Sequence, residues 1–504
     1  MTSPVTTVVV PTVGRSSLSA LCGALARQST PVDAPVVLVD DRPSGRDLMV
    51  QLAAELGPDS GLDLRVVRSG GGGPARARNI GWRHARTPWV SFLDDDVVPA
   101  PDWYATLLRD LEKAHADDAA GSAGRVQVPL PPDRRPTDWE RGTAGLETSR
   151  WITADLGYRR SDLSAVGGFD ERFPRAFRED ADLALRLGGD RGRILQGERR
   201  TTHPVRPADD WASLRQQAGN ADDYLMRALH GPDWHQRAQA PVGRRARHVA
   251  TTVSGVLGLC GLLARAPRLA ALGLAGWLVG TGELAWARIA PGPRDRTEVR
   301  RMLLTSAAIP AAATYHSLRG ALGHRNVPPW RGLPELVLLD RDGTLVHDVP
   351  YNGDPERVRP VDGARAALDR LRAEGIRLAV VSNQSAVAKG LVTREDVDAV
   401  NARVSELLGP FEAFEVCPHD AGDGCACRKP APGLLERACA EAGVDPARTV
   451  MIGDIGADVQ AAAAAGVRAV LVPTPETRVE EVRTADRVAP SLADAVSLVL
   501  EGDW

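Results

Sequence analysis

The chain has 504 residues, of which 43% are apolar and 25% are charged. This length predicts two or three domains, and the composition is that of a globular protein, which excludes wholesale disorder. Lysine and arginine total 62 against 65 aspartates and glutamates, so the net charge of −3 gives no electrostatic reason to expect a nucleic-acid partner.

The first expected domain, residues 1–235, alternates short β-branched runs with helical stretches. The runs TTVVVPT, PVVLVDD, LRVVRSG and WVSFLDDD are typical of strands. Strands that alternate with helices predict an α/β domain with a mostly parallel sheet. The apolar start of the chain has no basic segment and is interrupted by Pro11, so we interpret it as the first strand and not as a signal peptide.

Acidic residues follow two of these predicted strands. Asp41 ends the second run, and Asp94, Asp95 and Asp96 end the fourth. Adjacent acids repel one another unless a cation lies among them, and nothing cationic in the adjacent sequence neutralises them. We therefore expect Asp94 and Asp96 near a Mn²⁺ or Mg²⁺ ion that bridges a diphosphate. His203, in TTHPV, is either a further metal or phosphate contact or a structural residue.

The motifs PT-x-GR, VDD, ARNxG, DDD, GGFDE and ED follow one another in an order that resembles the family-2, GT-A glycosyltransferases over residues 5–235. The resemblance implies inverting transfer from a nucleotide sugar to an acceptor that the sequence does not identify. The QxxRW signature of processive polysaccharide synthases is absent and no long membrane spans follow, so we expect transfer of a single sugar. The resemblance implies Asp180 as the base that deprotonates the acceptor hydroxyl. It also places Asp41 near the nucleotide and counts Arg78 and Glu179 among the substrate-binding residues.

Residues 236–333 are expected to form a helical connector. They contain two apolar runs, 249–264 and 269–282, each shorter than the ~20 residues that cross a bilayer. Two interpretations stay open, namely a helical hairpin packed on the transferase and a shallow peripheral membrane contact through residues 249–290. The packed hairpin would place the protein in the cytoplasm, and the membrane contact would place it at the inner face of the membrane.

Residues 334–504 repeat the α/β pattern, with strands expected at ELVLLDRDGT, IRLAVVSNQ, RTVMIGD and AVLVPT. Asp340 and Asp342 end the first of these strands, two residues apart and on the same side of the chain. Two neighbouring carboxylates require a cation, and Mg²⁺ is the expected one. With the charge neutralised, one carboxylate can attack phosphorus while the other protonates the leaving oxygen.

Other polar residues follow the later strands of this domain. Ser382 and Asn383 offer a hydroxyl and an amide to phosphoryl oxygens, Lys429 offers a positive charge, and Asp454 offers a further metal ligand. The order DxDGT, S/TN, K and GDxxxD resembles the haloacid dehalogenase (HAD) phosphatase superfamily. That resemblance implies a HAD-like Rossmannoid fold.

The same resemblance implies roles for the acids. Asp340 would be the nucleophile that forms an aspartyl-phosphate, and Asp342 would be the acid and base. Asp340, Asp342 and Asp454 would hold Mg²⁺.

A cluster of soft ligands lies in the loop CPHDAGDGCACRKP. Its spacing, C-x-H-x₅-C-x-C, joins Cys417, His419, Cys425 and Cys427. Three thiolates and an imidazole suit a closed, tetrahedral and therefore structural Zn²⁺ site. Such a site would hold the loop that presents Lys429 and its neighbour, the expected substrate-binding residue Arg428. Cysteines gathered in one place also indicate a reducing compartment.

This loop, with SNQS and RKPxPG, is similar to the branch that contains D-glycero-D-manno-heptose 1,7-bisphosphate phosphatases and histidinol-phosphate phosphatases. The short spacer between His419 and Cys425 resembles the histidinol type, whereas the attached transferase favours a sugar phosphate. We therefore expect hydrolysis of the 7-phosphate of the heptose bisphosphate, with histidinol phosphate or another small phosphomonoester as the alternative. An alternative of another class is that one half is a non-catalytic binding or scaffolding domain.

Overall fold

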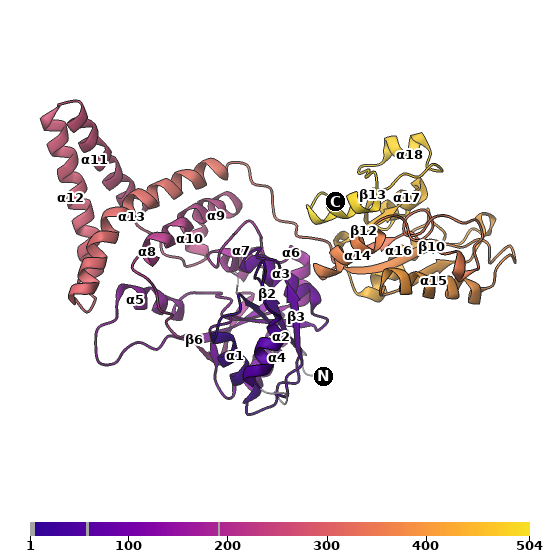
Figure 1. Ribbon diagram of the computed structural model, residues 1–504, viewed down its shortest axis with the longest axis horizontal. Coiled ribbons are helices and arrows are strands. Elements are labelled where there is room, and N and C mark those ends of the chain that lie inside the picture. The colour runs from indigo at the N-terminus through magenta and orange to yellow at the C-terminus, as the bar shows by residue number, and fades with distance from the viewer. Residues whose placement is uncertain (1–5, 57–59, 190–191) are drawn as a thin grey trace. The chain divides into compact units, whose positions relative to one another are not determined.

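The computed structural model describes residues 6–56, 60–189 and 192–504 and separates into two compact units. The first unit extends to residue 330, and the second comprises residues 331–504 together with residues 164–168. Each unit has its own sheet (Figure 1). Both units are α/β, as the sequence predicts.

Within its described residues, the first unit has an eight-stranded sheet in the order β3-β2-β1-β4-β7-β6-β8-β5. The strands are β1 Thr6–Thr12, β2 Val36–Asp40, β3 Leu64–Arg68, β4 Trp89–Leu93, β5 Val98–Pro99, β6 Gly121–Gln127, β7 Asp155–Arg159 and β8 Ile194–Thr202. The first four neighbours are parallel, but β7 is antiparallel to both β4 and β6. Beyond β4 the sheet is mixed, since β6 and β8 pair in parallel while β5 pairs antiparallel with β8, so the predicted parallel pairing is interrupted at β7 and at β5. Strands β6 and β8 are rich in glycine and polar residues, so they lack the apolar runs of β1, β2 and β4.

Helices pack on this sheet through small residues and buried apolar side chains. Strands β1, β2 and β4 are buried over nearly their whole length, which explains their continuous apolar runs. Helix α3 lies close to β1 because Gly81 has no side chain, and a Cβ there would lie 2.2 Å from a methyl of Val9. The helices before the connector are α1 Ser17–Ala26, α2 Leu48–Leu56, α3 Pro74–His84, α4 Trp103–Ala116, α5 Asp138–Ala144, α6 Arg160–Val166, α7 Glu179–Arg186, α8 Ala212–Arg215, α9 Asp222–His230 and α10 Trp234–Arg237.

The connector consists of three long helices, α11 Arg245–Leu263, α12 Pro267–Ile289 and α13 Arg296–Gly323. Helices α11 and α12 form an antiparallel hairpin, and α13 passes its foot (Figure 1). With 19 and 23 residues, α11 and α12 are longer than the apolar runs in the sequence and are long and apolar enough to cross a membrane. Only 22% of the most apolar window of each helix is buried, which disagrees with the interpretation of a hairpin packed on the transferase.

The second unit has a five-stranded parallel sheet in the order β11-β10-β9-β12-β13. Its strands are β9 Leu336–Leu339, β10 Arg377–Asn383, β11 Phe414–Cys417, β12 Thr449–Gly453 and β13 Arg468–Leu471. Its helices are α14 Ala364–Ala373, α15 Arg394–Leu408, α16 Gly433–Ala442, α17 Gly456–Ala464, α18 Val479–Thr484 and α19 Leu492–Leu500. Two apolar clusters are built from alternate residues of the central strands, so both faces of the sheet are covered.

Candidate active sites

The first candidate site lies at the carboxyl ends of β2, β1 and β4. The order of strands reverses between β1 and β4, and ligands of open α/β sheets bind in the crevice at such a point. A cavity of about 220 Å³ lies there. Its polar lining residues include four predicted ones, Asp41, Arg78, Asp94 and Asp96, and also Thr12, Arg15, Asp95 and Arg206.

The three adjacent acids have cationic neighbours that are distant in the sequence. Arg15 donates to Asp95 at 2.7 Å, and Arg78 donates to Asp94 at 2.9 Å. Arg206 Nε lies 2.5 Å from Asp96 Oδ2. The adjacent sequence holds no cation for these acids, as the sequence analysis notes, but the fold brings arginines from three separate segments to the strand end.

Two of these acids still form a group suited to a metal. One ligand atom each from Asp94, Asp96 and His203 lies within 4.8 Å of the others. Burial raises the pKa of Asp96, and the neighbouring Asp94 raises it further, against the effects of His203 and Arg206. Carboxylate oxygens with one imidazole fit Mn²⁺ or Mg²⁺, so the donor set agrees with the metal that the sequence predicts.

A buried ion pair lies behind the cavity. Arg78 is fully buried and donates to Glu179 at 2.8 Å as well as to Asp94. Burial raises the pKa of Glu179 to about 8, Asp180 adds to that effect, and Arg78 opposes it. Glu179 therefore holds the guanidinium of Arg78 in position. The structure does not show the predicted contact of Glu179 with substrate.

Asp180, the predicted base, is the second residue of α7. Burial raises its pKa, while Arg78 lowers it. A carboxyl whose pKa lies above its ordinary value is better matched to proton abstraction near neutral pH. Asp180 does not appear among the described residues that line the cavity.

Asp41 organises the glycine-rich loop that precedes α3. Its carboxylate accepts hydrogen bonds from the Ser69 hydroxyl at 2.6 Å and from the backbone N–H of Gly73 at 3.0 Å. Gly73 has φ +89°, which glycine adopts readily, and it caps the helix that starts at Pro74. Asp41 thus holds the loop beside the cavity.

The second candidate site lies at the carboxyl ends of β10, β9 and β12. Carboxylate oxygens of Asp340, Asp454 and Asp458 lie within 4.8 Å of one another. Gly343 permits this approach, since it has φ +84° and a Cβ there would lie 2.3 Å from Asp454 Oδ2. Three buried carboxylates are hard oxygen ligands, which fits Mg²⁺.

Asp342, predicted as a further Mg²⁺ ligand, is not part of this group. Its carboxylate is bound by the guanidinium of Arg341 at 2.9 Å and by the amide of Gln384 at 2.8 Å. The immediately preceding arginine therefore turns Asp342 away from the other acids. Gln384 also donates to the buried Ser382 hydroxyl at 2.7 Å, which connects Asp342 with a predicted phosphate contact.

Lys429 supplies the positive charge of the second site. Its ammonium group contacts Asp340, lies 2.6 Å from Asp458 and donates to the carbonyl of Val381 at 2.9 Å. Burial works against this charge, but Asp340 and Asp458 outweigh it and raise the pKa of Lys429. Burial also raises the pKa of Asp340 well above its ordinary value, although Lys429 acts in the opposite direction. A metal ion can therefore stabilise the Asp340 carboxylate further, and a phosphoryl group can stabilise the Lys429 ammonium group.

Asn383 has a partner other than the predicted phosphoryl oxygens. Its amide N–H donates to the Lys429 carbonyl, and its Oδ1 accepts from the Lys429 N–H, each at 3.0 Å. Asn383 thereby fixes the backbone of Lys429. Arg428, also predicted at the substrate, donates instead to the carbonyl of His419 at 3.2 Å.

The four soft ligands converge beside this lysine. Sulfur–sulfur separations among the cysteines are 3.3, 3.5 and 3.7 Å, and His419 Nδ1 lies 3.3 Å from Cys427 and 3.6 Å from Cys417. A tetrahedral Zn²⁺ with Zn–S bonds of ~2.3 Å has ligand atoms about 3.8 Å apart. The set therefore fits Zn²⁺ with all four positions filled.

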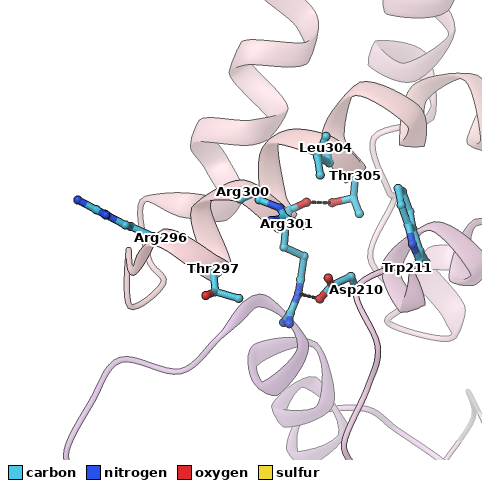
Figure 2. A pocket seen from close by; sticks show the side chains of 8 residues that line it. All are labelled: Asp210, Trp211, Arg296, Thr297, Arg300, Arg301, Leu304 and Thr305. Carbon is cyan, nitrogen blue, oxygen red and sulfur yellow. Dashed lines mark hydrogen bonds and ion pairs between the residues drawn. The ribbon is translucent and has the colours of Figure 1, made fainter.

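A separate cavity of about 360 Å³ lies between the start of α13 and the loop at Trp211 (Figure 2). Arg296, Arg300 and Arg301 face it, and Arg301 donates to Asp210 at 2.7 Å. None of the predicted catalytic acids is among its lining residues within the described chain. It is therefore not a candidate for either catalytic centre.

Three residues that the structure places in the two candidate sites had no predicted role. Arg15 lies in the PT-x-GR motif but was not assigned to an acid, and Arg206 had no motif around it. Asp458 carries a usable signal, because the GDxxxD spacing places it one helical turn after Asp454. Its contact with Lys429 is visible only in three dimensions.

Comparison with known proteins agrees with two separate enzymes. Residues 7–166 match the family described as Glycosyl transferase family 2, and residues 426–495 match the HAD-hydrolase-like family. D-glycero-beta-D-manno-heptose-1,7-bisphosphate 7-phosphatase from Pseudomonas aeruginosa is 36% identical over 144 residues, covering 28% of this chain and 81% of the relative. The enzyme of that name from Pasteurella multocida is 32% identical over 179 residues, covering 33% of this chain and 97% of the relative.

Among solved structures, the D,D-heptose 1,7-bisphosphate phosphatase of B. bronchiseptica with magnesium and phosphate is 29% identical, covering 33% of this chain and 99% of that chain, with a TM-score of 0.31. Residues 1–349 of S. aureus TarS with UDP-GlcNAc are 16% identical, covering 64% of this chain and 92% of that chain, with a TM-score of 0.33. The family assignment rests on the sequence matches and not on these structural similarities.

Proposed function

The chain belongs to the D-glycero-β-D-manno-heptose-1,7-bisphosphate 7-phosphatase family through its second unit and carries a family-2 glycosyltransferase domain in its first, and on this premise we propose the two reactions and their residues. The expected GT-A-like and HAD-like domains are confirmed, and so is the presence of two enzyme families in one chain. The proposed division is a transferase at residues 1–235, a helical connector at 236–333 and a phosphatase at 334–504.

The second unit hydrolyses a phosphomonoester through a covalent aspartyl-phosphate. Asp340 attacks phosphorus, the bond from phosphorus to the ester oxygen breaks, and Asp342 gives a proton to the departing alkoxide. Asp342 then takes a proton from the water that hydrolyses the aspartyl-phosphate, which releases phosphate and restores Asp340. Arg341 donates a hydrogen bond to the Asp342 side chain, so this contact must open for Asp342 to reach the leaving oxygen.

Lys429 and the acids around it carry this assignment. Asp340 and Asp454 would hold Mg²⁺, with Asp458 beside them, and the ion supplies charge neutralisation for the phosphoryl oxygens. Lys429 lies against the nucleophile and stabilises both the carboxylate and the transferred group. The contact of Lys429 with Asp340 and Asp458 is the single observation that supports the reaction most directly.

The proposed substrate is D-glycero-D-manno-heptose 1,7-bisphosphate, hydrolysed at the 7-phosphate. The relatives with that name exceed 30% identity and are covered over most of their length, which favours this substrate over histidinol phosphate. Histidinol phosphate or another small phosphomonoester is the alternative because the spacer between His419 and Cys425 is short. Zn²⁺ in the cysteine cluster would be structural.

The first unit transfers a sugar from a nucleotide sugar with inversion. Asp94 and Asp96 would hold Mn²⁺ or Mg²⁺, which supplies positive charge for the departing nucleoside diphosphate. Asp180 removes the proton of the acceptor hydroxyl, and its raised pKa suits that role. Arg78 and Asp41 contact the donor, and the location is the cytoplasm, with residues 249–290 at the inner face of a membrane.

One experiment tests both activities in the full chain. Phosphate release is measured over a panel of sugar phosphates and histidinol phosphate, for the wild type and for Asp340→Asn, with Asp102→Asn as an exposed control. We expect Asp340→Asn to abolish phosphate release while sugar transfer stays unchanged. Normal phosphate release by this variant would overturn Asp340 as the nucleophile, whereas no release by the wild type on any substrate of the panel would favour a second unit that only binds or scaffolds.

A further inference from the structure

The hairpin of α11 and α12 is held together by small residues. A Cβ on Gly273 would lie 2.2 Å from the backbone nitrogen of Gly258, and one on Gly261 would lie 2.4 Å from that of Ala270. The two backbones therefore pack directly against each other and leave the large side chains on the outside. Small residues at the contact are typical of helix pairs in membranes, where apolar outer surfaces cost nothing.

Many large apolar side chains of α11 and α12 are exposed, although each helix contacts its partner helix and α13. The most exposed on α11 include Leu259 at 57% and Leu263 at 77%, and those on α12 include Leu272 at 75% and Leu278 at 61%. A protein partner would cover one face of the hairpin, whereas a lipid environment covers all of them at once. An apolar helix without a polar face is typical of a protein core or a membrane, and this hairpin is not in the core.

Charged side chains lie only at the two ends of the hairpin. None occurs in residues 249–264 or 269–282. At the foot, Arg244 and Arg247 lie 2.9 and 2.8 Å from Glu283, and Arg265 and Arg268 lie at the tip. Residues 249–263 of α11, 15 residues without a charge, span about 22 Å at ~1.5 Å per residue, against a hydrocarbon core of ~30 Å. Long arginine side chains at the tip can reach the far headgroups.

A second apolar surface begins at the foot of the hairpin. Ala311, Tyr315, Leu318 and Leu322 recur at helical spacing on α13 and are all exposed, while the opposite face of α13 packs on the first unit. The hydroxyls of Thr252 in α11 and Thr314 in α13 lie 3.1 Å apart, so this stripe starts beside the hairpin. An apolar stripe on a helix that is anchored on its other side is the form of an interfacial helix.

We propose that the hairpin of α11 and α12 inserts into a lipid bilayer and that the apolar stripe of α13 lies on the surface of the same bilayer. The foot of the hairpin then places its arginines at the anionic headgroups. This inference deepens the peripheral contact included in the proposed function from a shallow contact to insertion. It depends on neither catalytic assignment, because its readout is vesicle binding.

Flotation of the full chain with vesicles tests the insertion. Vesicles of phosphatidylcholine alone, and of phosphatidylcholine with phosphatidylglycerol, are mixed with the wild type, with Leu259→Asp in the hairpin and with Leu391→Asp in the second unit. Leu259 and Leu391 are matched, since both are 57% exposed. Because a carboxylate within the apolar part of an inserted helix is strongly disfavoured, we expect Leu259→Asp to reduce partitioning on the order of 100-fold and Leu391→Asp to leave it unchanged.

The wild type is expected to float with both vesicle types and to remain bound after a high-salt wash. Release by salt would show adsorption through the arginines only and would overturn insertion. A folded wild type that does not float, or a Leu259→Asp variant that floats like the wild type, would also overturn it. So would a wild-type oligomer without vesicle binding that Leu259→Asp dissociates, because the hairpin would then be covered by a second copy of the chain.

Discussion

The side chain of Asn383 exchanges two hydrogen bonds with the backbone of Lys429, each 3.0 Å long. One residue ends β10, and the other lies two positions after the last ligand of the cysteine cluster. The pair therefore joins the sheet to the loop that carries the catalytic charge. Its effect is to set the position of the Lys429 backbone, from which the ammonium group reaches Asp340.

Asn383→Asp keeps the size of this side chain but replaces its N–H donor with an oxygen that faces the Lys429 carbonyl. We expect kcat for phosphate release to fall by about 100-fold, since a displacement of a catalytic group by ~1 Å can cost that much. Steady-state kinetics measures the effect, with the exposed Asn326→Asp as the matched control. An unchanged kcat would show that the position of Lys429 does not depend on Asn383.

The cysteine cluster is expected to hold about one Zn²⁺ per chain after dialysis against Mg²⁺ buffer. Cys425→Ser should lose the zinc and unfold the second unit at lower temperature, because loss of a structural metal is a loss of folding free energy, here up to about 4 kcal/mol. Metal analysis and calorimetry provide the measurements. Cys260→Ser, at an exposed cysteine outside the cluster, is the control. A folded and fully active protein without zinc contradicts this prediction.

Mg²⁺ affinity of the second site should depend on pH through Asp454. Burial, with Asp458 adding to it, raises the pKa of Asp454 to about 7. Since this folded-state pKa lies above the unfolded value, the proton stabilises the metal-free unit at low pH, and that stabilisation is lost as pH rises through about 7. Mg²⁺ needs the ionised form, so its affinity should fall by up to about tenfold per pH unit below 7 and level off above pH ~8.

Calorimetric titration of Mg²⁺ between pH ~6 and ~8.5 checks this dependence. The metal-free unfolding temperature of the second unit should move in the opposite direction over the same range. In Asp454→Asn the pH dependence of both quantities should be reduced. A Mg²⁺ affinity that is flat across this range would mean that Asp454 is not a ligand.

The two acids of the transferase site should affect different quantities. Asp180→Asn removes the proposed base, so turnover should fall by about 10²–10⁴-fold while the affinity for the donor stays nearly unchanged. Asp96→Asn should weaken the metal-dependent binding of a nucleoside diphosphate itself. Calorimetry with a panel of nucleoside diphosphates, with and without Mn²⁺, separates the two effects, and Asp102→Asn is the exposed control. Metal-independent binding, or equal loss in both variants, would show that the site is misassigned.

The parts of the fold that follow a local sequence pattern could be predicted. The apolar strands β1, β2, β4 and β9 could be predicted because each is buried and each ends in acids or polar residues. The antiparallel strand β7 could not, because its sequence DLGYR has no continuous apolar run although the strand is buried, and β6 and β8 could not, because buried and exposed residues are mixed along them. Exposure of the hairpin was also beyond prediction, because an apolar helix reads the same whether protein or lipid surrounds it.

The candidate sites also contain residues that a local motif predicts and residues that only the fold brings together. The ligand cluster at Cys417 and the acids at Asp94 and Asp340 lie within short motifs, so their spacing alone indicates a metal. Arg206 and Asp96 pair although they are 110 positions apart in the sequence, and no local pattern predicts this contact. A local motif can also mislead. The motif around Asp342 indicates a metal ligand, but a hydrogen bond from its neighbour Arg341 holds the Asp342 side chain away from the other acids.

The place of the hairpin in the chain has a consequence for how the protein is made. Synthesis proceeds from the N-terminus, so α12 leaves the ribosome after every strand of the first sheet and before any strand of the second. The first sheet can therefore close before the exposed leucines of the hairpin emerge. For the time needed to translate the remaining residues, those leucines stay exposed on the nascent chain, and a targeting factor or a bilayer can engage them before the second unit is made.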